Sequence, residues 1–222
     1  MTWTLPNILT VIRLLAAPGV AVAFLVLPRP WADWLGLVLF VGAALTDWFD
    51  GHLARRWGQV SKFGAMLDPI ADKAMVVIAL LVVTGYAGMP VLLVLPATLI
   101  LFREVFVSGL REFLGDTAGL LKVTRLAKWK TMLQMVAIAV LFAEGVLEHH
   151  VGMLSQGMDA ATFAQVVTDQ VPDDLGLGWK YQLMLLTWYG GLVLIWVAAA
   201  LTVMTGWDYF VKALPFLRDE EA

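Results

Sequence analysis

The 222-residue sequence contains no cysteine, only three histidines and few charged side chains, 15% of the total. The lack of cysteine excludes disulfides, thiolate catalysis and cysteine-bound zinc. Two of the histidines are the neighbours His149 and His150, and the three together do not have the spacing of a metal site. With a net charge of -3, the chain has no electrostatic basis for binding nucleic acid. A thiol enzyme, a zinc protein and a nucleic-acid partner are therefore not expected.

Apolar residues make up 60% of the sequence, and the mean hydropathy is +0.81. Such a composition lies outside the range of soluble domains and indicates an integral membrane protein. The fold class that we predict is all-α, with one membrane domain over residues 1–222. A signal peptide is not expected at the N-terminus, because the first apolar run is long and contains Arg13. Six transmembrane helices are predicted, over residues 8–28, 31–47, 64–84, 89–102 with a helical extension to 114, 131–147 and 181–204.

The basic residues of the short connections predict the orientation, because Lys and Arg are enriched on the cytoplasmic side. With six helices, nearly all of them fall on one side, and only Arg29 and Lys180 fall on the other. Both termini are therefore predicted to be cytoplasmic. Arg13 is expected at an interfacial position on the same side. The loop 148–180 lies on the far side, and its apolar content predicts a short surface helix.

Four acidic residues lie where a membrane protein would least tolerate them, since an unpaired charge in hydrocarbon costs at least about 2.5 to 3.5 kcal/mol. If residues 35–55 form one helix, Asp47 and Asp50 share a face with Gly51, Ala54 and Arg55. On the next helix, Asp68 and Asp72 are one turn apart, about 6 Å along the axis. The two pairs are predicted to converge on a cation. Carboxylate oxygens on rigid elements suit Mg2+ or Mn2+ and leave coordination positions open for a substrate phosphate.

A purely structural interpretation of these acids stays open at this point. Asp50 and Gly51 could form a turn between two helices, and Asp68 could cap the second helix ahead of Pro69. The acids could also pair with nearby basic side chains, namely Arg55, Arg56, Lys62 and Lys73.

A second group of charges follows on the next two helices. Arg103 and Arg111 are eight residues apart, which is about 80° around a helix, so both can face one cavity. Lys128 opens the fifth helix. Two arginines and a lysine beside a metal cluster would suit a phosphate dianion, although Arg125 and Lys130 are expected to be ordinary topological signals.

The spacing D-x2-D-G-x2-A-R-x8-G-x3-D-x3-D matches the signature of the CDP-alcohol phosphotransferase family at every fixed position. The resemblance implies a six-helix homodimer whose polar, metal-containing cavity opens to the cytoplasm and to lipid. It implies Mg2+ or Mn2+, two ions, held by Asp47, Asp50, Asp68 and Asp72, with Asp72 as a ligand, the general base or both. It also implies that the CDP group lies beside Gly51, Ala54, Arg55 and Gly64.

Further stretches are similar to bacterial inner-membrane members of the family. These stretches are 6–13, 46–51, 67–73, 103–104 with 110–112, and 128–135, while the loop 148–180 is expected to be an insertion. The similarity implies transfer of the phosphatidyl group from CDP-diacylglycerol to sn-glycerol 3-phosphate, releasing CMP, in phospholipid biosynthesis. The phosphate of the acceptor would bind to Arg103, Arg111, Lys128 and Tyr209.

Two alternative functions remain open. A family member with another acceptor, such as inositol phosphate, serine, choline or phosphatidylglycerol, would show the same acidic motif. A cation or proton transporter would also carry intramembrane acids, but it should show internal repeats and acids spread over several helices. The sequence has no repeat, and its four acids lie between two consecutive predicted helices.

Overall fold

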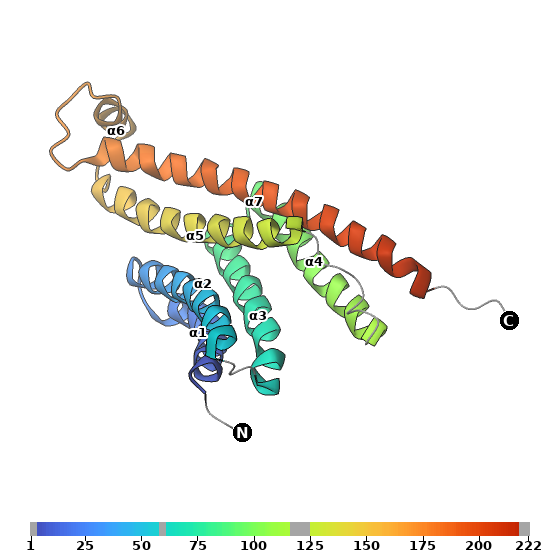
Figure 1. Ribbon diagram of the computed structural model, residues 1–222. Coiled ribbons are helices and arrows are strands. Elements are labelled where there is room, and N and C mark those ends of the chain that lie inside the picture. Colours follow the sequence, from blue (N-terminus) through green and yellow to red (C-terminus); the bar gives the residue numbers. More distant parts are fainter. Residues whose placement is uncertain (1–3, 58–60, 116–124, 218–222) are drawn as a thin grey trace.

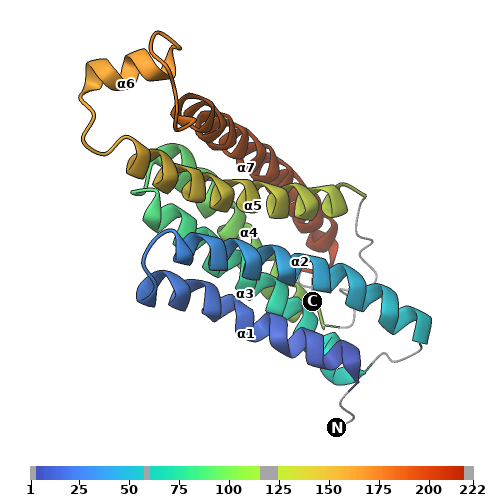
Figure 2. The same cartoon turned by 90° about the vertical axis from the view of Figure 1, so that its left-hand side faces the viewer.

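The computed structural model describes residues 4–57, 61–115 and 125–217, and these form seven α-helices and one short 3-10 helix, without any strand (Figures 1 and 2). The predicted all-α class is confirmed. The elements are α1 (Leu5–Val26), α2 (Trp31–Trp57), α3 (Lys62–Tyr86), α4 (Val91–Leu114), α5 (Arg125–Leu154), α6 (Ala160–Val167), α7 (Leu177–Ala213) and η2 (Leu214–Phe216).

Four stretches of helix in the described part of the chain are long and apolar enough to cross a membrane. They are Asn7–Val26 in α1, Val91–Leu114 in α4, Trp129–Leu154 in α5, and Leu177–Phe216 in α7 and η2. This number is characteristic of a multi-pass membrane protein. The helices α2 and α3, which carry the acidic motif, are not among the four.

Both acid-bearing helices are longer than their apolar runs. The helix α2 continues beyond Asp47 to Trp57, so the proposed turn at Asp50 and Gly51 is wrong. The helix α3 begins at Lys62, and its cap is Ser61, whose hydroxyl accepts a hydrogen bond from the backbone N–H of Gly64 at 2.9 Å. Asp68 is therefore not a cap but lies inside the helix, in its second turn.

The helices pack in two groups that meet along one seam. In the first group, α1 packs against α2 and α3; in the second, α7 packs against α4 and α5 (Figure 1). Contacts of α5 with α2 and α3, and of α4 with α3, join the two groups. The acids lie in the first group, and the predicted phosphate-binding arginines lie in the second.

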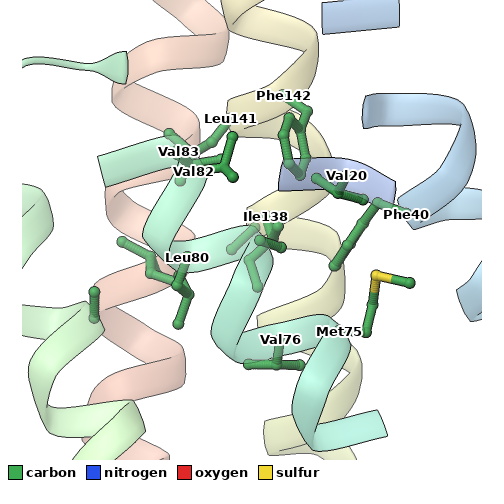
Figure 3. Packing of buried hydrophobic residues seen from close by; sticks show 14 of the residues in the cluster. Val20, Phe40, Met75, Val76, Leu80, Val82, Val83, Ile138, Leu141 and Phe142 are labelled. Carbon is green, nitrogen blue, oxygen red and sulfur yellow. The ribbon is translucent and has the colours of Figure 1, made fainter. Parts of the chain in front are cut away.

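The core fills the seam with side chains from both groups. Figure 3 shows Val20 of α1, Phe40 of α2, Leu80 of α3 and Ile138 of α5 packed into one cluster. Small residues let the helices approach closely, as is usual where lipid gives no hydrophobic drive between helices. At Gly191 of α7, for example, an added Cβ would lie 2.7 Å from the Leu141 side chain.

The segment between α5 and α7 contains α6, the predicted short surface helix. It lies at the end of the bundle opposite both chain termini, and Val166 packs against Val151 and Leu177 (Figure 2).

Two acids of this segment cap helices. Asp159 accepts from the N–H of Thr162 in α6, and Asp173 accepts from the N–H groups that begin α7. The N–H groups of Gly178 and Leu177 hold the pKa of the Asp173 carboxyl below its ordinary value.

Candidate active site

Two acids from different helices meet at one arginine of α1. The Nη1 atom of Arg13 donates to Oδ1 of Asp47 at 2.7 Å and to Oδ1 of Asp72 at 2.8 Å. The guanidinium is buried, with 2% of the side chain exposed, whereas the two carboxylates are 52% and 50% exposed. The sequence predicted only an interfacial position for Arg13 and did not predict these two contacts. The two ion pairs of Arg13 connect α1 to both α2 and α3.

The third described acid also contacts α1. The hydroxyl of Thr10 donates to Oδ1 of Asp68 at 2.7 Å. One turn earlier, Oδ1 of Asn7 accepts from the hydroxyl of Ser61 at 2.7 Å. The side chains of Asn7, Thr10 and Arg13 thus contact the N-terminal part of α3 at three successive levels, and all three residues are buried.

Gly64 of α3 lies close against the side chain of Asn7 of α1. A Cβ added at Gly64 would lie 2.8 Å from Oδ1 of Asn7 and 3.3 Å from the hydroxyl of Ser61. This contact explains the glycine without reference to a ligand.

Replacing Gly64 by Ala is expected to lower the thermal unfolding midpoint of the detergent-solubilised protein, because overpacking typically costs about 1 to 3 kcal/mol. The matched control is Gly85→Ala in the same helix, where no atom lies within 4 Å of the added Cβ. That variant should not lose stability, since alanine is favoured over glycine inside helices by about 0.5 to 1 kcal/mol. Equal midpoints for the two variants would show that α1 and α3 are not tightly packed at Gly64.

Five predicted site residues have side chains outside the described part of the structure: Asp50, Gly51, Ala54, Arg55 and Lys128. Their backbone belongs to α2 and α5, so the first four share the helix with Asp47, as predicted. Among the described residues, no group of three or more acids, histidines or cysteines could hold a metal ion by itself.

The three described acids nevertheless suit a hard divalent cation. Each uses its Oδ1 atom for a hydrogen bond to α1. The second oxygen of each carboxylate meets no donor from the described part of the chain. Carboxylate oxygens are the ligands that Mg2+ and Mn2+ prefer, and outer hydrogen bonds of this kind orient such ligands.

A cluster of cations lies on the neighbouring helices around a single acid, Glu104 of α4. The Nζ atom of Lys130 lies 2.5 Å from Oε1 of Glu104, and Nη1 of Arg103 lies 3.1 Å from the same oxygen. Only 6% of the Lys130 side chain is exposed. Lys130 is therefore a buried member of this cluster, a role beyond the topological signal that the sequence predicted.

Lys73 connects this cluster to the acids. It follows Asp72 directly in α3, and its Nζ atom donates to the hydroxyl of Ser108 in α4 at 2.5 Å. The same hydroxyl donates to the backbone oxygen of Glu104. The acids and the cation cluster therefore lie on adjoining sides of α3, where Asp72 and Lys73 are consecutive residues.

Arg111 and Tyr209 come together at the outer side of the cation cluster. The guanidinium carbon of Arg111 lies 5.4 Å from the centre of the Tyr209 ring. One turn before Tyr209, Gly206 makes room for Arg103, since an added Cβ would lie 2.9 Å from Cγ of Arg103. Of the four residues predicted for the acceptor phosphate, Arg111 and Tyr209 are therefore in contact, and Arg103 lies against α7 one turn before Tyr209.

Two polar atoms in this region are buried without a partner among the described residues: Nε of Arg103 and the hydroxyl of Tyr209. A buried donor without a partner costs free energy, so such atoms usually meet a ligand or a water molecule. Both groups can donate a hydrogen bond, and a bound anion would accept it.

The sequence of the chain can be compared with those of known proteins. The sequence profile of the CDP-alcohol phosphatidyltransferase family matches residues 3–204. The chain belongs to this family. The resemblance inferred from the spacing of the acidic motif is thereby confirmed.

Several relatives share the same name, CDP-diacylglycerol–glycerol-3-phosphate 3-phosphatidyltransferase. The one from Cereibacter sphaeroides is 64% identical over 222 residues, which is the whole of both chains. The one from Rickettsia bellii is 36% identical over 206 residues, 93% of each chain. The one from Salmonella choleraesuis is 42% identical over 141 residues, 63% of this chain and 76% of its own. Because the Cereibacter match covers both chains completely, residues 148–180 are not peculiar to this family member.

Sequence reasoning missed several polar residues that surround the site in this family member: Asn7, Thr10, Lys73, Glu104 and Ser108. One of the missed patterns could have been recognised. Asn7, Thr10 and Arg13 follow one another at intervals of three residues in an otherwise apolar helix, which places them on one face. The contacts of Lys73 with Ser108 and of Lys130 with Glu104 depend on how the helices pack, and no local pattern indicates them.

Proposed function

We propose that this protein transfers the phosphatidyl group of CDP-diacylglycerol to sn-glycerol 3-phosphate, giving phosphatidylglycerophosphate and CMP. The full-length identity of 64% to the Cereibacter sphaeroides protein of that name is the observation that carries the proposal. The arrangement around α3 supports it, because Asp72 belongs to the acids and the next residue, Lys73, belongs to the cations. A metal-bound donor diphosphate and an anionic acceptor would then bind side by side.

Asp47, Asp50, Asp68 and Asp72 would hold two Mg2+ or Mn2+ ions. Such ions, when bound, neutralise charge on a diphosphate and favour its in-line displacement. Gly51, Ala54, Arg55 and Gly64 would lie beside the CDP group.

The reaction requires the chain to align the two substrates and to accept one proton. The 1-hydroxyl oxygen of sn-glycerol 3-phosphate forms a bond to the phosphorus that carries diacylglycerol, and the bond from this phosphorus to the CMP oxygen breaks. CMP leaves with that electron pair, and the hydroxyl proton passes to a carboxylate. Asp72 is the base, because it lies furthest along α3 among the acids and closest to the cations.

The phosphate of the acceptor would be held by Arg103, Arg111, Lys128 and Tyr209, with Lys73 and Lys130 close by. Lys130 and Arg103 share the carboxylate of Glu104, so one negative charge faces three described cations, and the cluster keeps a net positive charge. A phosphate dianion complements this charge, whereas a neutral acceptor such as serine or inositol does not.

Replacing Arg111 by Ala is expected to raise the KM for sn-glycerol 3-phosphate about tenfold to a hundredfold, with little change in the KM for CDP-diacylglycerol. A charge-assisted hydrogen bond contributes about 1.5 to 3 kcal/mol, which corresponds to that range of affinity. The measurement is steady-state CMP release at varied concentrations of each substrate.

The control for Arg111 is Lys212→Ala, which also removes a positive charge near Tyr209. Lys212 is half-exposed and paired with Asp208 at 2.6 Å, so its loss should leave both KM values unchanged. If the defect of Arg111→Ala affects CDP-diacylglycerol instead, Arg111 does not bind the acceptor.

The protein would act as a homodimer in the bacterial inner membrane, with six membrane-spanning helices and both termini in the cytoplasm. The described basic residues support this orientation. Lys62, Arg103, Lys130 and Lys212 lie at the end of the bundle that holds the acids, and Arg29 and Lys180 lie at the end beside α6. Soluble sn-glycerol 3-phosphate and CMP would then reach the site from the cytoplasm.

The proposal is tested by incubating the purified protein with CDP-diacylglycerol, Mn2+ or Mg2+, and a panel of acceptors. CMP release is expected with sn-glycerol 3-phosphate, and EDTA should stop it reversibly. Glycerol, serine, inositol, inositol phosphate and phosphatidylglycerol should be poor acceptors. Efficient transfer to any of these would overturn the choice of acceptor while leaving the family unchanged.

A further inference from the structure

We infer that Thr10 and Arg13 form a positioning face on α1, which fixes the carboxylates of Asp47, Asp68 and Asp72 in the orientation that a divalent cation needs. The inference rests on the proposed metal centre and adds α1 to it. The acidic motif lies entirely in α2 and α3, so nothing in the motif itself assigns this role to the first helix.

The contacts are regularly spaced along two helices. Thr10 and Arg13 are three residues apart on α1, and their partners Asp68 and Asp72 are four residues apart on α3. Both spacings are close to one helical turn, about 4.5 and 6 Å along the axis. Each acid of α3 therefore meets its own donor on α1, and Asp47 of α2 shares the donor of Asp72.

The hydrogen-bond donors of this site are buried, whereas two of its carboxylates are partly exposed. Thr10 and Arg13 are both 2% exposed, whereas Asp47 and Asp72 are half-exposed. The donors therefore lie behind the carboxylates, within the protein, and the exposed parts of the carboxylates face away from them. A cation that approaches from the open side can bind the second oxygens without displacing Arg13.

The positive charge of the Arg13 guanidinium offsets the repulsion between two of the acids. Asp47 and Asp72 would repel each other if no cation lay between them, and Arg13 is the described cation that contacts both. A carboxylate pair held in this way is already oriented before the metal binds, so little ordering is required at that step. Outer hydrogen bonds to metal ligands typically contribute about 10-fold to 100-fold in metal affinity.

The test uses full-length protein in detergent and follows Mn2+ binding by the electron paramagnetic resonance signal of the free ion, without any turnover. Thr10→Val keeps the shape of the side chain and removes the hydroxyl, whereas Thr10→Ser keeps the hydroxyl. We expect Thr10→Val to bind Mn2+ about 10-fold to 100-fold more weakly and Thr10→Ser to bind it nearly as well as the wild type.

The control is Thr84→Val. Thr84 is a buried threonine of α3 whose hydroxyl donates to the backbone oxygen of Leu80 at 2.6 Å, far along the helix from the acids. Its Mn2+ affinity should equal that of the wild type. A loss in Thr84→Val as large as that in Thr10→Val would assign the effect to general destabilisation and overturn the inference.

The variant Arg13→Gln tests whether Arg13 supports the binding of Mn2+ or competes with the ion for the carboxylates. A weaker Mn2+ affinity is the result we expect; a tighter one would mean that Arg13 competes with the ion, and would overturn the inference. If Arg13→Gln does not fold, the Thr10 pair decides the question alone. Unchanged affinity in Thr10→Val would overturn the inference and leave the metal centre intact, whereas a wild-type protein that binds no Mn2+ would overturn the proposed metal centre as well.

Discussion

Replacing Asp68 by Asn is expected to reduce CMP release to background while the protein still inserts and folds. The amide keeps the oxygen that accepts the hydrogen bond of Thr10, so the contact between α1 and α3 can persist. The exchange removes a negative charge and a metal-ligating oxygen from the site, and the remaining carboxylates cannot complete the ligand set. Asp47→Asn and Asp50→Asn should have the same effect.

The measurement is CMP release with saturating Mn2+, together with the thermal unfolding midpoint of each variant. Asp169→Asn is the matched control, because it makes the same change of charge in the exposed segment before α7. Asp169 has a φ of 57°, a conformation that asparagine also adopts readily. Near-normal turnover in Asp47→Asn, Asp50→Asn or Asp68→Asn would remove that residue from the proposed metal site.

Replacing Asp72 by Asn is expected to lower kcat by about 10² to 10⁴, the contribution typical of general-base catalysis. If Asp72 is chiefly the base, Mn2+ and CDP-diacylglycerol should still bind, because Asp47, Asp50 and Asp68 are unchanged and the amide oxygen can still accept from Arg13. The variant therefore separates the proton acceptor from the metal ligands.

The measurement combines single-turnover kinetics with Mn2+ titration of the same preparation. If Asp72→Asn loses Mn2+ affinity as strongly as Asp68→Asn does, Asp72 acts mainly as a ligand. The role of base would then belong to another group in the site.

The apolar runs predicted the existence and order of the long helices, because each run is long enough to form one and is separated from the next by polar residues. They did not predict where α2 and α7 end. The helix α2 continues ten residues beyond Asp47, through a polar stretch whose helical form a hydropathy pattern does not indicate. The helix α7 likewise extends past the predicted residue 204 to Ala213, where Tyr209 packs against α4.

The spacing of the acids predicted that Asp47 and Asp72 approach each other, although they are 25 residues apart in the sequence. It could not predict their common partner. The nearby basic residues, Arg55 and Lys73 among them, were plausible partners by distance along the chain. The observed partner, Arg13, lies 34 and 59 residues away, and only the packing of α1 against α2 and α3 brings it there.

The partners of the cations could not be predicted from the sequence either. A lysine beside a membrane-spanning helix usually serves as a topological signal, so the position of Lys130 in the sequence says nothing of its burial. Its burial follows from the packing of both α4 and α5 against α7 and α3, which leaves Glu104 within reach of its ammonium group. Sequence spacing therefore predicts which residues share a helix face, and helix packing decides which of these faces meet.

The central claim is that the acids and cations around α3 transfer a phosphatidyl group to sn-glycerol 3-phosphate. The most direct test uses CDP-diacylglycerol labelled with 32P at the phosphorus that carries diacylglycerol, with Mn2+ and unlabelled sn-glycerol 3-phosphate. The account predicts that the label appears in phosphatidylglycerophosphate, that one unlabelled CMP is released for each product molecule, and that omitting the acceptor stops both. Label in CMP, label in phosphatidic acid, or CMP release that is independent of sn-glycerol 3-phosphate would contradict it.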